Sequence, residues 1–191
     1  MKLTLLDNAA ELRARFFERF VMTWEEFQAT HADWIAELAD KGYTIDRNWY
    51  SQAYMWDRMS PAFPSVSFRE ALAILRSVEE PVLFLSEAPD HHSRPRLFHE
   101  GEPHTDFAAV CDGAELADLL EEEWFEEYRL AEQNMYNPNR VLPYEVYVTD
   151  RGMTWFIAFT HETTDWDSEL TDPMKAAESR YCICTKSIDT N

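Results

Sequence analysis

The stretch YEVYVTDRGMTWFIAFT, residues 144–160, decides the fold class. Apolar, aromatic and β-branched residues dominate positions 144–148 and again 154–160, and the turn sequence Asp150-Arg151-Gly152 separates the two runs. Two such runs around a glycine-containing turn are typical of a β-hairpin. The sequence therefore predicts a β-sheet that contains this hairpin.

Three more short apolar runs extend the predicted sheet. They lie at residues 82–85, 107–111 and 181–185, and each is short enough to be a buried strand. Helical patterns come mostly before residue 80. We expect an α+β fold, with an antiparallel or mixed sheet of about five strands covered on one side by helices. We expect a single domain over residues 1–191, helical over about 1–80 and sheet-rich over about 81–191.

Helix starts are marked by side chains that can cap them. Asp7 precedes a helical pattern over residues 8–21, and two Ser/Thr-x-x-Glu capping boxes begin at Thr23 and Ser67. The first box predicts a helix that ends near Gly42, and the pattern over 46–59 predicts a less regular one. Asp112 caps a predicted long helix.

The composition restricts the class of protein. The chain has 191 residues, a net charge of −19 and 14% aromatic residues. The aromatic content argues against disorder, and the negative charge argues against binding to a nucleic-acid backbone or to anionic lipid. We find no apolar run of membrane-spanning length and no signal-peptide pattern, and therefore expect a cytoplasmic protein.

The three cysteines do not form a disulfide framework. Cys111, Cys182 and Cys184 are an odd, small number for a chain of this length. Cys182 and Cys184 are two residues apart in a predicted strand, so we expect them on one face as small buried apolar residues.

The acidic charge is concentrated in the C-terminal part of the chain. Residues 112–132 contain nine acids and one base. Glu122, Glu123, Glu126 and Glu127 place like charges on adjacent turns, which lowers intrinsic helix stability. Such a surface either keeps the protein soluble or meets a basic partner.

A second acidic segment contains Asp165, Trp166 and Asp167. Its alternating acids resemble a calcium-binding loop, but the glycine and glutamate that an EF-hand requires are Leu170 and Ala176 here. We interpret the segment as a charged turn that adds to a partner-binding surface. Trp124 and Trp166 are candidate aromatic anchors, although Trp124 also fits the apolar stripe of its helix.

Catalytic and metal-binding motifs are weak. Residues 90–106 contain four histidines, including His99 and His104, but their spacing matches no metal motif. Ser86-Glu87 and His161-Glu162 each end a predicted strand, so a base and a hydroxyl could meet at one sheet edge. We expect no cofactor and no bound metal, and catalysis is the less favoured interpretation.

Three stretches carry a resemblance to other proteins: residues 81–87 (PVLFLSE), 142–148 (LPYEVYV) and 155–162 (WFIAFTHE). They are similar to segments of small bacterial proteins, some of which resemble the immunity proteins of polymorphic toxin systems. The resemblance covers roughly the C-terminal half and carries no catalytic residue. It implies a protein that binds and neutralises a toxin.

These observations predict a binding protein for a cationic protein partner, such as a nuclease toxin, with no direct nucleic-acid contact and no membrane association. The partner would meet Glu122, Glu123, Trp124, Glu126, Glu127, Asp165, Trp166 and Asp167. Three alternatives remain: a DNA mimic that blocks a nucleic-acid-binding protein, a metal-dependent enzyme that uses residues 90–106, and a self-assembling protein.

Overall fold

The core of the molecule is one antiparallel sheet. The computed structural model describes residues 2–87, 97–99, 102–131, 141–143, 145–163 and 180–186. Within them, seven strands pair in the order β1-β6-β3-β7-β8-β9-β2, and every pairing is antiparallel. The strands are β1 (Leu3–Leu5), β2 (Ser65–Ser67), β3 (Val82–Leu85), β6 (Ala108–Cys111), β7 (Val146–Thr149), β8 (Phe156–Thr163) and β9 (Arg180–Cys184).

The α+β class is confirmed, but the expected number of about five strands is wrong. The two extra strands, β1 and β2, lie at the two edges of the sheet and are only three residues long. A three-residue segment is too short to show an alternating pattern, and its place in the sheet is set by its pairing partner. The histidine-containing segment 90–106 also contributes a small separate hairpin, β4 (Leu97–His99) and β5 (Glu102–His104).

The central hairpin forms as predicted. Strands β7 and β8 pair from Val146 opposite Phe159 to Thr149 opposite Phe156. The turn between them is closed by the backbone N–H of Met153, which donates to the carbonyl of Asp150 at 3.0 Å.

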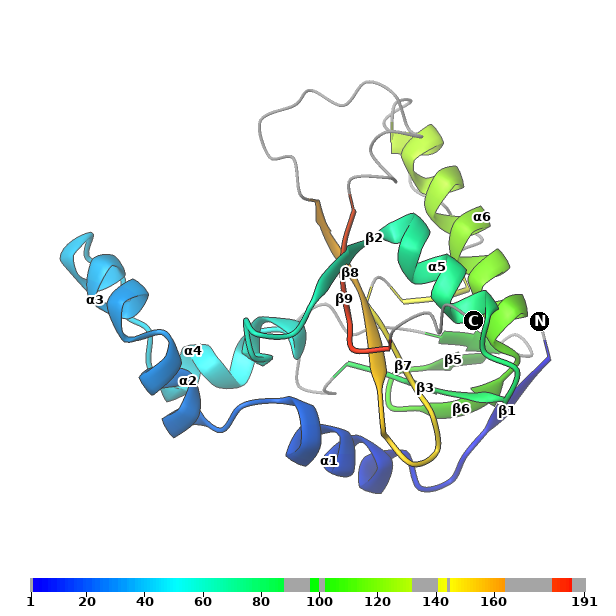
Figure 1. The fold of residues 1–191 in the computed structure, drawn as a ribbon, viewed down its shortest axis with the longest axis horizontal. Coiled ribbons are helices and arrows are strands. Elements are labelled where there is room, and N and C mark those ends of the chain that lie inside the picture. The colour runs from blue at the N-terminus through cyan, green and yellow to red at the C-terminus, as the bar shows by residue number, and fades with distance from the viewer. Residues whose placement is uncertain are drawn as a thin grey trace.

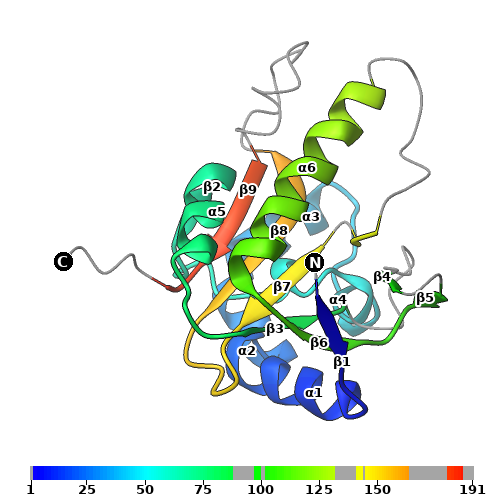
Figure 2. The ribbon, with the colours of Figure 1, turned by 90° about the vertical axis from the view of Figure 1, so that its right-hand side faces the viewer.

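Helices cover both faces of the sheet, not one as expected. Helix α1 (Ala9–Phe20) lies on one face, and α5 (Phe68–Arg76) and α6 (Gly113–Ala131) lie on the other (Figure 2). The strands supply both cores because successive side chains point to opposite faces. In β3, Leu83 packs in the α1 core and Phe84 in the α5–α6 core. The two-faced burial explains why β3 is apolar throughout.

Helices α5 and α6 approach each other closely. Gly113 begins α6, and a Cβ atom at this position would lie 2.8 Å from the carbonyl oxygen of Leu75. A glycine is therefore required for this approach. The predicted capping box at Ser67 is present, with Ser67 and Glu70 bonded to each other's backbone N–H.

The remaining helices form an arm, which we define as residues 24–58. It consists of α2 (Trp24–Thr30), α3 (Ala32–Asp40), α4 (Arg47–Gln52) and the short 3-10 helix η1 (Trp56–Arg58). Helices α2, α3 and α4 extend away from the sheet (Figure 1). The expected helix from Thr23 is interrupted at His31, and the pattern over 46–59 forms two short helices.

Among the described residues, no helix is both long enough and apolar enough to cross a membrane.

Candidate functional site

The arm is organised around the side chain of Phe27. The capping box of Thr23 and Glu26 begins α2 and places Phe27 one turn later, where only 2% of it is exposed. Its ring centroid lies 5.8 Å from that of Trp49 and 6.4 Å from that of Trp34. Phe27 of α2 therefore packs against one ring from α3 and one from α4.

These rings form one wall of a pocket of about 400 Å³. It is lined by Phe27, His31, Trp34, Trp49 and Asp57, and we call it the arm pocket. Trp34 is 39% exposed at its mouth. Of the described residues, Trp34 and Tyr43 are the two large apolar side chains that are exposed, and both belong to the arm. Of these two side chains, Trp34 lines the arm pocket and is accessible to a molecule that enters it.

The arm pocket also contains polar atoms. Asp57 provides a carboxylate, one oxygen of which accepts the backbone N–H of Tyr54 at 3.2 Å. His31 Nε2 is buried and has no hydrogen-bond partner within the described part of the chain. A buried nitrogen without a hydrogen-bond partner is energetically costly.

The surroundings of the arm pocket are acidic. The arm contains seven acidic and three basic side chains, and two of the basic ones are ion-paired. Lys41 pairs with Glu37, and Arg47 pairs with Glu25. The remaining acids of the arm are Glu26, Asp33, Asp40, Asp46 and Asp57. A cation entering the pocket would meet aromatic faces inside a negative field.

Arg58 joins the arm to the body of the protein. It is buried, and its guanidinium lies 4.8 Å from the ring centroid of Phe17 on α1 and 5.2 Å from that of Tyr50 on α4. The Tyr50 hydroxyl donates to the carbonyl of Met22, and burial raises the pKa of this tyrosine. The base of the arm is therefore packed rather than loosely tethered.

The acidic helix α6 is less available to a partner than its sequence suggests. Glu122 is exposed, but Glu123 is 5% exposed and Trp124 is fully buried. Trp124 stacks on Phe68 with their ring centroids 4.5 Å apart, so of its two interpretations the structure supports a core residue. Glu126 is half-buried, and the side chain of Glu127 lies outside the described residues.

Glu123 has a structural role. Its carboxylate accepts the backbone N–H of Val141 at 2.6 Å and that of Leu142 at 3.0 Å. It therefore ties α6 to the segment that leads into β7. This corrects its expected place on the partner-binding face, because a carboxylate inside the protein cannot meet a partner. The helical pattern could not show this, since α6 carries glutamates on most of its surface.

Arg76 partly neutralises the outer face of α6. Its guanidinium pairs with Asp118 at 2.8 Å and also with Glu121. The hydrogen bond to Glu121 is the main reason that the pKa of Arg76 is raised. The predicted site residues Asp165, Trp166 and Asp167 lie outside the described residues.

The structure brings Ser86, Glu87 and His161 to the same end of the sheet. A base and a hydroxyl would have to meet there if these residues were catalytic. The Ser86 hydroxyl accepts the N–H of Phe107 at 3.2 Å and also bonds Arg13 at 3.2 Å. It is fully buried, and the hydrogen bonds described for it do not include His161. These contacts favour a structural role for Ser86 over that of a nucleophile.

The carboxylates at this end of the sheet also hold the fold together. Glu87 is fully buried and accepts the Tyr147 hydroxyl at 2.6 Å and the N–H of Met55 at 3.1 Å. Burial, followed by the charge of Glu87, raises the pKa of Tyr147 well above its ordinary value. Glu145 is buried and bonds Nδ1 of His161. These bonds connect η1, β3, β7 and β8.

Metal binding finds no support among the described residues, which contain no group of three His, Cys, Asp or Glu side chains able to hold an ion. Much of the histidine-rich segment, including residues 90–96 and the side chain of His99, is outside the described part. His104 is half-buried in β5. Cys182 and Cys184 lie in the same core, as predicted, and all three cysteines are buried and form no disulfide.

Comparisons of the chain with protein-family models, curated proteins and solved structures find no match. The functional argument therefore depends on the residues of this chain.

The arm pocket was missed at the sequence level. Trp34 and Trp49 have helical spacing, which does not separate a core stripe from an exposed one. The available signal was the density of aromatic residues among acids over residues 24–57.

Proposed function

We propose that this protein binds a basic protein partner and that the arm pocket receives a lysine or arginine side chain of that partner. The observation that carries the proposal is the exposed aromatic pocket of Phe27, Trp34 and Trp49 with the Asp57 carboxylate in its wall. Aromatic faces attract a cation, and an adjacent carboxylate adds charge complementarity.

The charge of the whole chain supports the same proposal. A net charge of −19 attracts a cationic protein from a distance and raises the association rate. Buried aromatic residues then provide most of the binding energy at an interface, while surrounding charges give orientation and specificity. In this arrangement Glu122 on α6 and the acids of the arm steer the partner, and Trp34 anchors it.

The specific form that we propose is a cytoplasmic bacterial inhibitor that neutralises a toxin by covering its basic cleft, as an immunity protein does. A nuclease is the partner class with the most suitable cleft, because an enzyme that binds a phosphate backbone must present a basic surface. Asp165, Trp166 and Asp167 remain part of the proposed contact surface.

The test is a capture experiment with the full-length protein and lysate of its native host, washed at low and then high salt. A specific basic partner should be retained at low salt and released as salt rises, because screening weakens the attraction between the two surfaces. The partner is identified by mass spectrometry.

The matched variants make the test specific to the arm pocket. Trp34→Ala should abolish capture, whereas Tyr43→Ala, which removes an exposed aromatic side chain of the arm outside the pocket, should retain it. Equal capture by both variants would exclude the arm pocket as the site. A partner lost equally from both would show a contact that is not specific to the pocket.

A further inference from the structure

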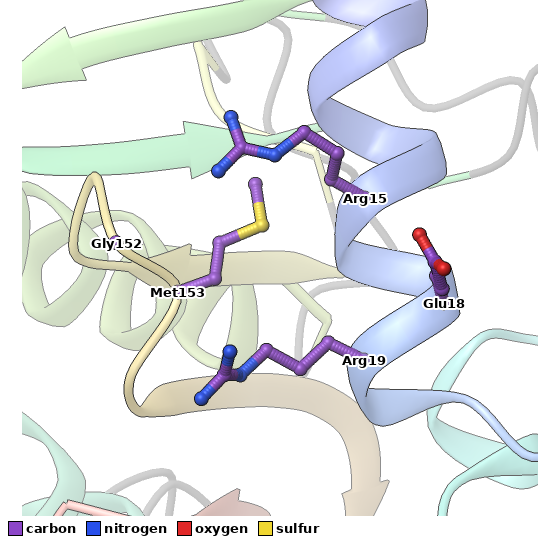
Figure 3. Close-up of a pocket in the computed structure, with 5 residues that line it drawn as sticks. All are labelled: Arg15, Glu18, Arg19, Gly152 and Met153. Atoms are coloured by element: carbon purple, nitrogen blue, oxygen red, sulfur yellow. The ribbon is translucent and has the colours of Figure 1, made fainter.

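A second pair of pockets lies away from the arm, beside helix α1. The first has a volume of about 330 Å³ and is lined by Arg15, Glu18, Arg19, Gly152 and Met153. Arg15 and Arg19 are four residues apart and extend from α1 towards the β7–β8 turn, with Met153 between them (Figure 3). Side chains at this spacing lie on the same face of a helix.

The second pocket is adjacent, since Arg15 lines both. Its volume is about 310 Å³, and its polar lining consists of Arg15, Arg151 and Asn8. Its floor is apolar and is made by Leu6, Leu12, Leu83 and Val110. Together the two pockets combine guanidinium groups with an apolar surface.

The arginines of these pockets are not neutralised. Within the described part of the chain, no ion pair is made by Arg15, Arg19 or Arg151. The guanidinium carbon of Arg19 lies 5.8 Å from the ring centroid of Phe20. The three arginines remain unpaired although the chain has 36 acidic and 17 basic residues. Three unpaired arginines at two adjoining pockets indicate an anionic ligand.

Among the described residues, three carboxylates near these pockets make no ion pair with the arginines, and one of them, Glu11, accepts a hydrogen bond from the Asn8 side chain at 3.4 Å. Glu18 lines the first pocket, but its carboxylate points away from the guanidinium groups (Figure 3). The carboxylate of Asp150 accepts the backbone N–H of Thr154 at 2.6 Å and its hydroxyl at 2.8 Å. It is therefore held within the turn.

The backbone of the turn has a defined shape. Met153 has φ of 53°, in the left-handed region that non-glycine residues seldom adopt, and its side chain is buried. The hydrogen bonds of Asp150 hold the chain in this conformation. The turn that borders the first pocket therefore has a fixed shape.

We propose that the two pockets form one binding site for a small organic oxyanion. Its phosphate or carboxylate group would lie between the guanidinium groups of Arg15 and Arg151, and Arg19, on the other side of Met153, would add positive charge. Its apolar body would cover Leu6, Leu12, Leu83 and Val110. Guanidinium groups bind both kinds of oxyanion through paired hydrogen bonds, and the apolar floor selects against inorganic ions. This site is separate from the arm pocket and does not depend on the proposed basic partner.

The test is a titration of the ¹⁵N-labelled full-length protein with phenyl phosphate, benzoate and inorganic phosphate, followed by NMR. Phenyl phosphate or benzoate should shift the amide signals of α1 and of residues 150–153 and should bind more tightly than inorganic phosphate. If phosphate is the preferred group, binding weakens below pH 6, where the dianion becomes protonated. If carboxylate is preferred, binding is constant across pH 6.

Paired variants separate this site from the general effect of charge. Arg15→Gln with Arg151→Gln should weaken binding by at least about tenfold, because charge-assisted hydrogen bonds are lost. Arg47→Gln with Arg69→Gln makes the same change in net charge at exposed positions outside these pockets and should leave the affinity unchanged. Equal weakening in both pairs would overturn the proposal, as would the absence of shifts in α1 or tighter binding of inorganic phosphate.

Discussion

Replacing Glu123 with glutamine should destabilise the protein, whereas the same change at its neighbour Glu122 should not. The two residues are adjacent in α6, but Glu123 is 5% exposed and Glu122 is on the surface. The Glu123 carboxylate accepts the backbone N–H groups of Val141 and Leu142, one on each oxygen. A glutamine of the same size keeps one oxygen and places an NH₂ group against the second N–H.

The expected loss follows from these two bonds. A hydrogen bond to a charged group contributes about 1.5–3 kcal/mol, and a buried N–H left without an acceptor adds a desolvation cost. One of the two bonds remains in the glutamine variant, so we expect the free energy of unfolding to fall by about 2 kcal/mol. For a domain of this size, that corresponds to a melting temperature lower by about 4–8 °C.

The measurement is urea unfolding at pH 7, followed by circular dichroism and by tryptophan fluorescence. Glu122→Gln is the control, because it removes the same charge from a chain of −19 and should change the free energy of unfolding by less than about 0.5 kcal/mol. Equal unfolding free energies for the two variants would refute the structural role of Glu123. A loss of stability in both would indicate an effect of charge on the whole helix.

Three further predictions concern the caps, the thiols and the buried tyrosine. Glu70→Gln should lower the urea midpoint at pH 7, and this difference should shrink as the pH falls below 4.5. The Ser67 backbone N–H bond lowers the pKa of Glu70, so its contribution is present above the ordinary value of 4.5 and is lost as pH falls through the lowered value. A midpoint difference that is constant from pH 7 to pH 3 would contradict this. The three thiols should not react with a disulfide reagent at pH 8 until the protein unfolds, because all three are buried and burial raises the pKa of Cys111 to about 12. Rapid reaction of the thiols in the folded protein would show that they are not buried. Tyr147→Phe removes a 2.6 Å bond to a buried Glu87 carboxylate and should lower the free energy of unfolding by about 1.5–3 kcal/mol in urea titration, and an unchanged value would exclude this contact.

Much of the sheet could be predicted because its central strands carry their own signal. The hairpin of β7 and β8, strand β3 and the capping box at Ser67 all follow from short local patterns. The edge strands β1 and β2 could not be predicted, since three residues have no measurable period and their pairing depends on distant partners.

The candidate site was harder to predict than the fold. The charge pattern predicted α6 as the contact surface, but it does not show which carboxylates point into the protein. Glu123 points inwards, and it accepts the backbone N–H groups of Val141 and Leu142. Similarly, helical spacing does not show that Trp124 is in the core while Trp34 is exposed. Both distinctions depend on tertiary packing.

The most direct test of the proposed function is hydrogen–deuterium exchange of the full-length protein with and without its captured partner. Binding at the arm pocket predicts slower exchange in α2, α3 and α4, centred on Trp34 and Trp49, with α1 unchanged. Protection confined to α6, or to the segment containing Trp166, would contradict the assignment of the arm as the main contact surface.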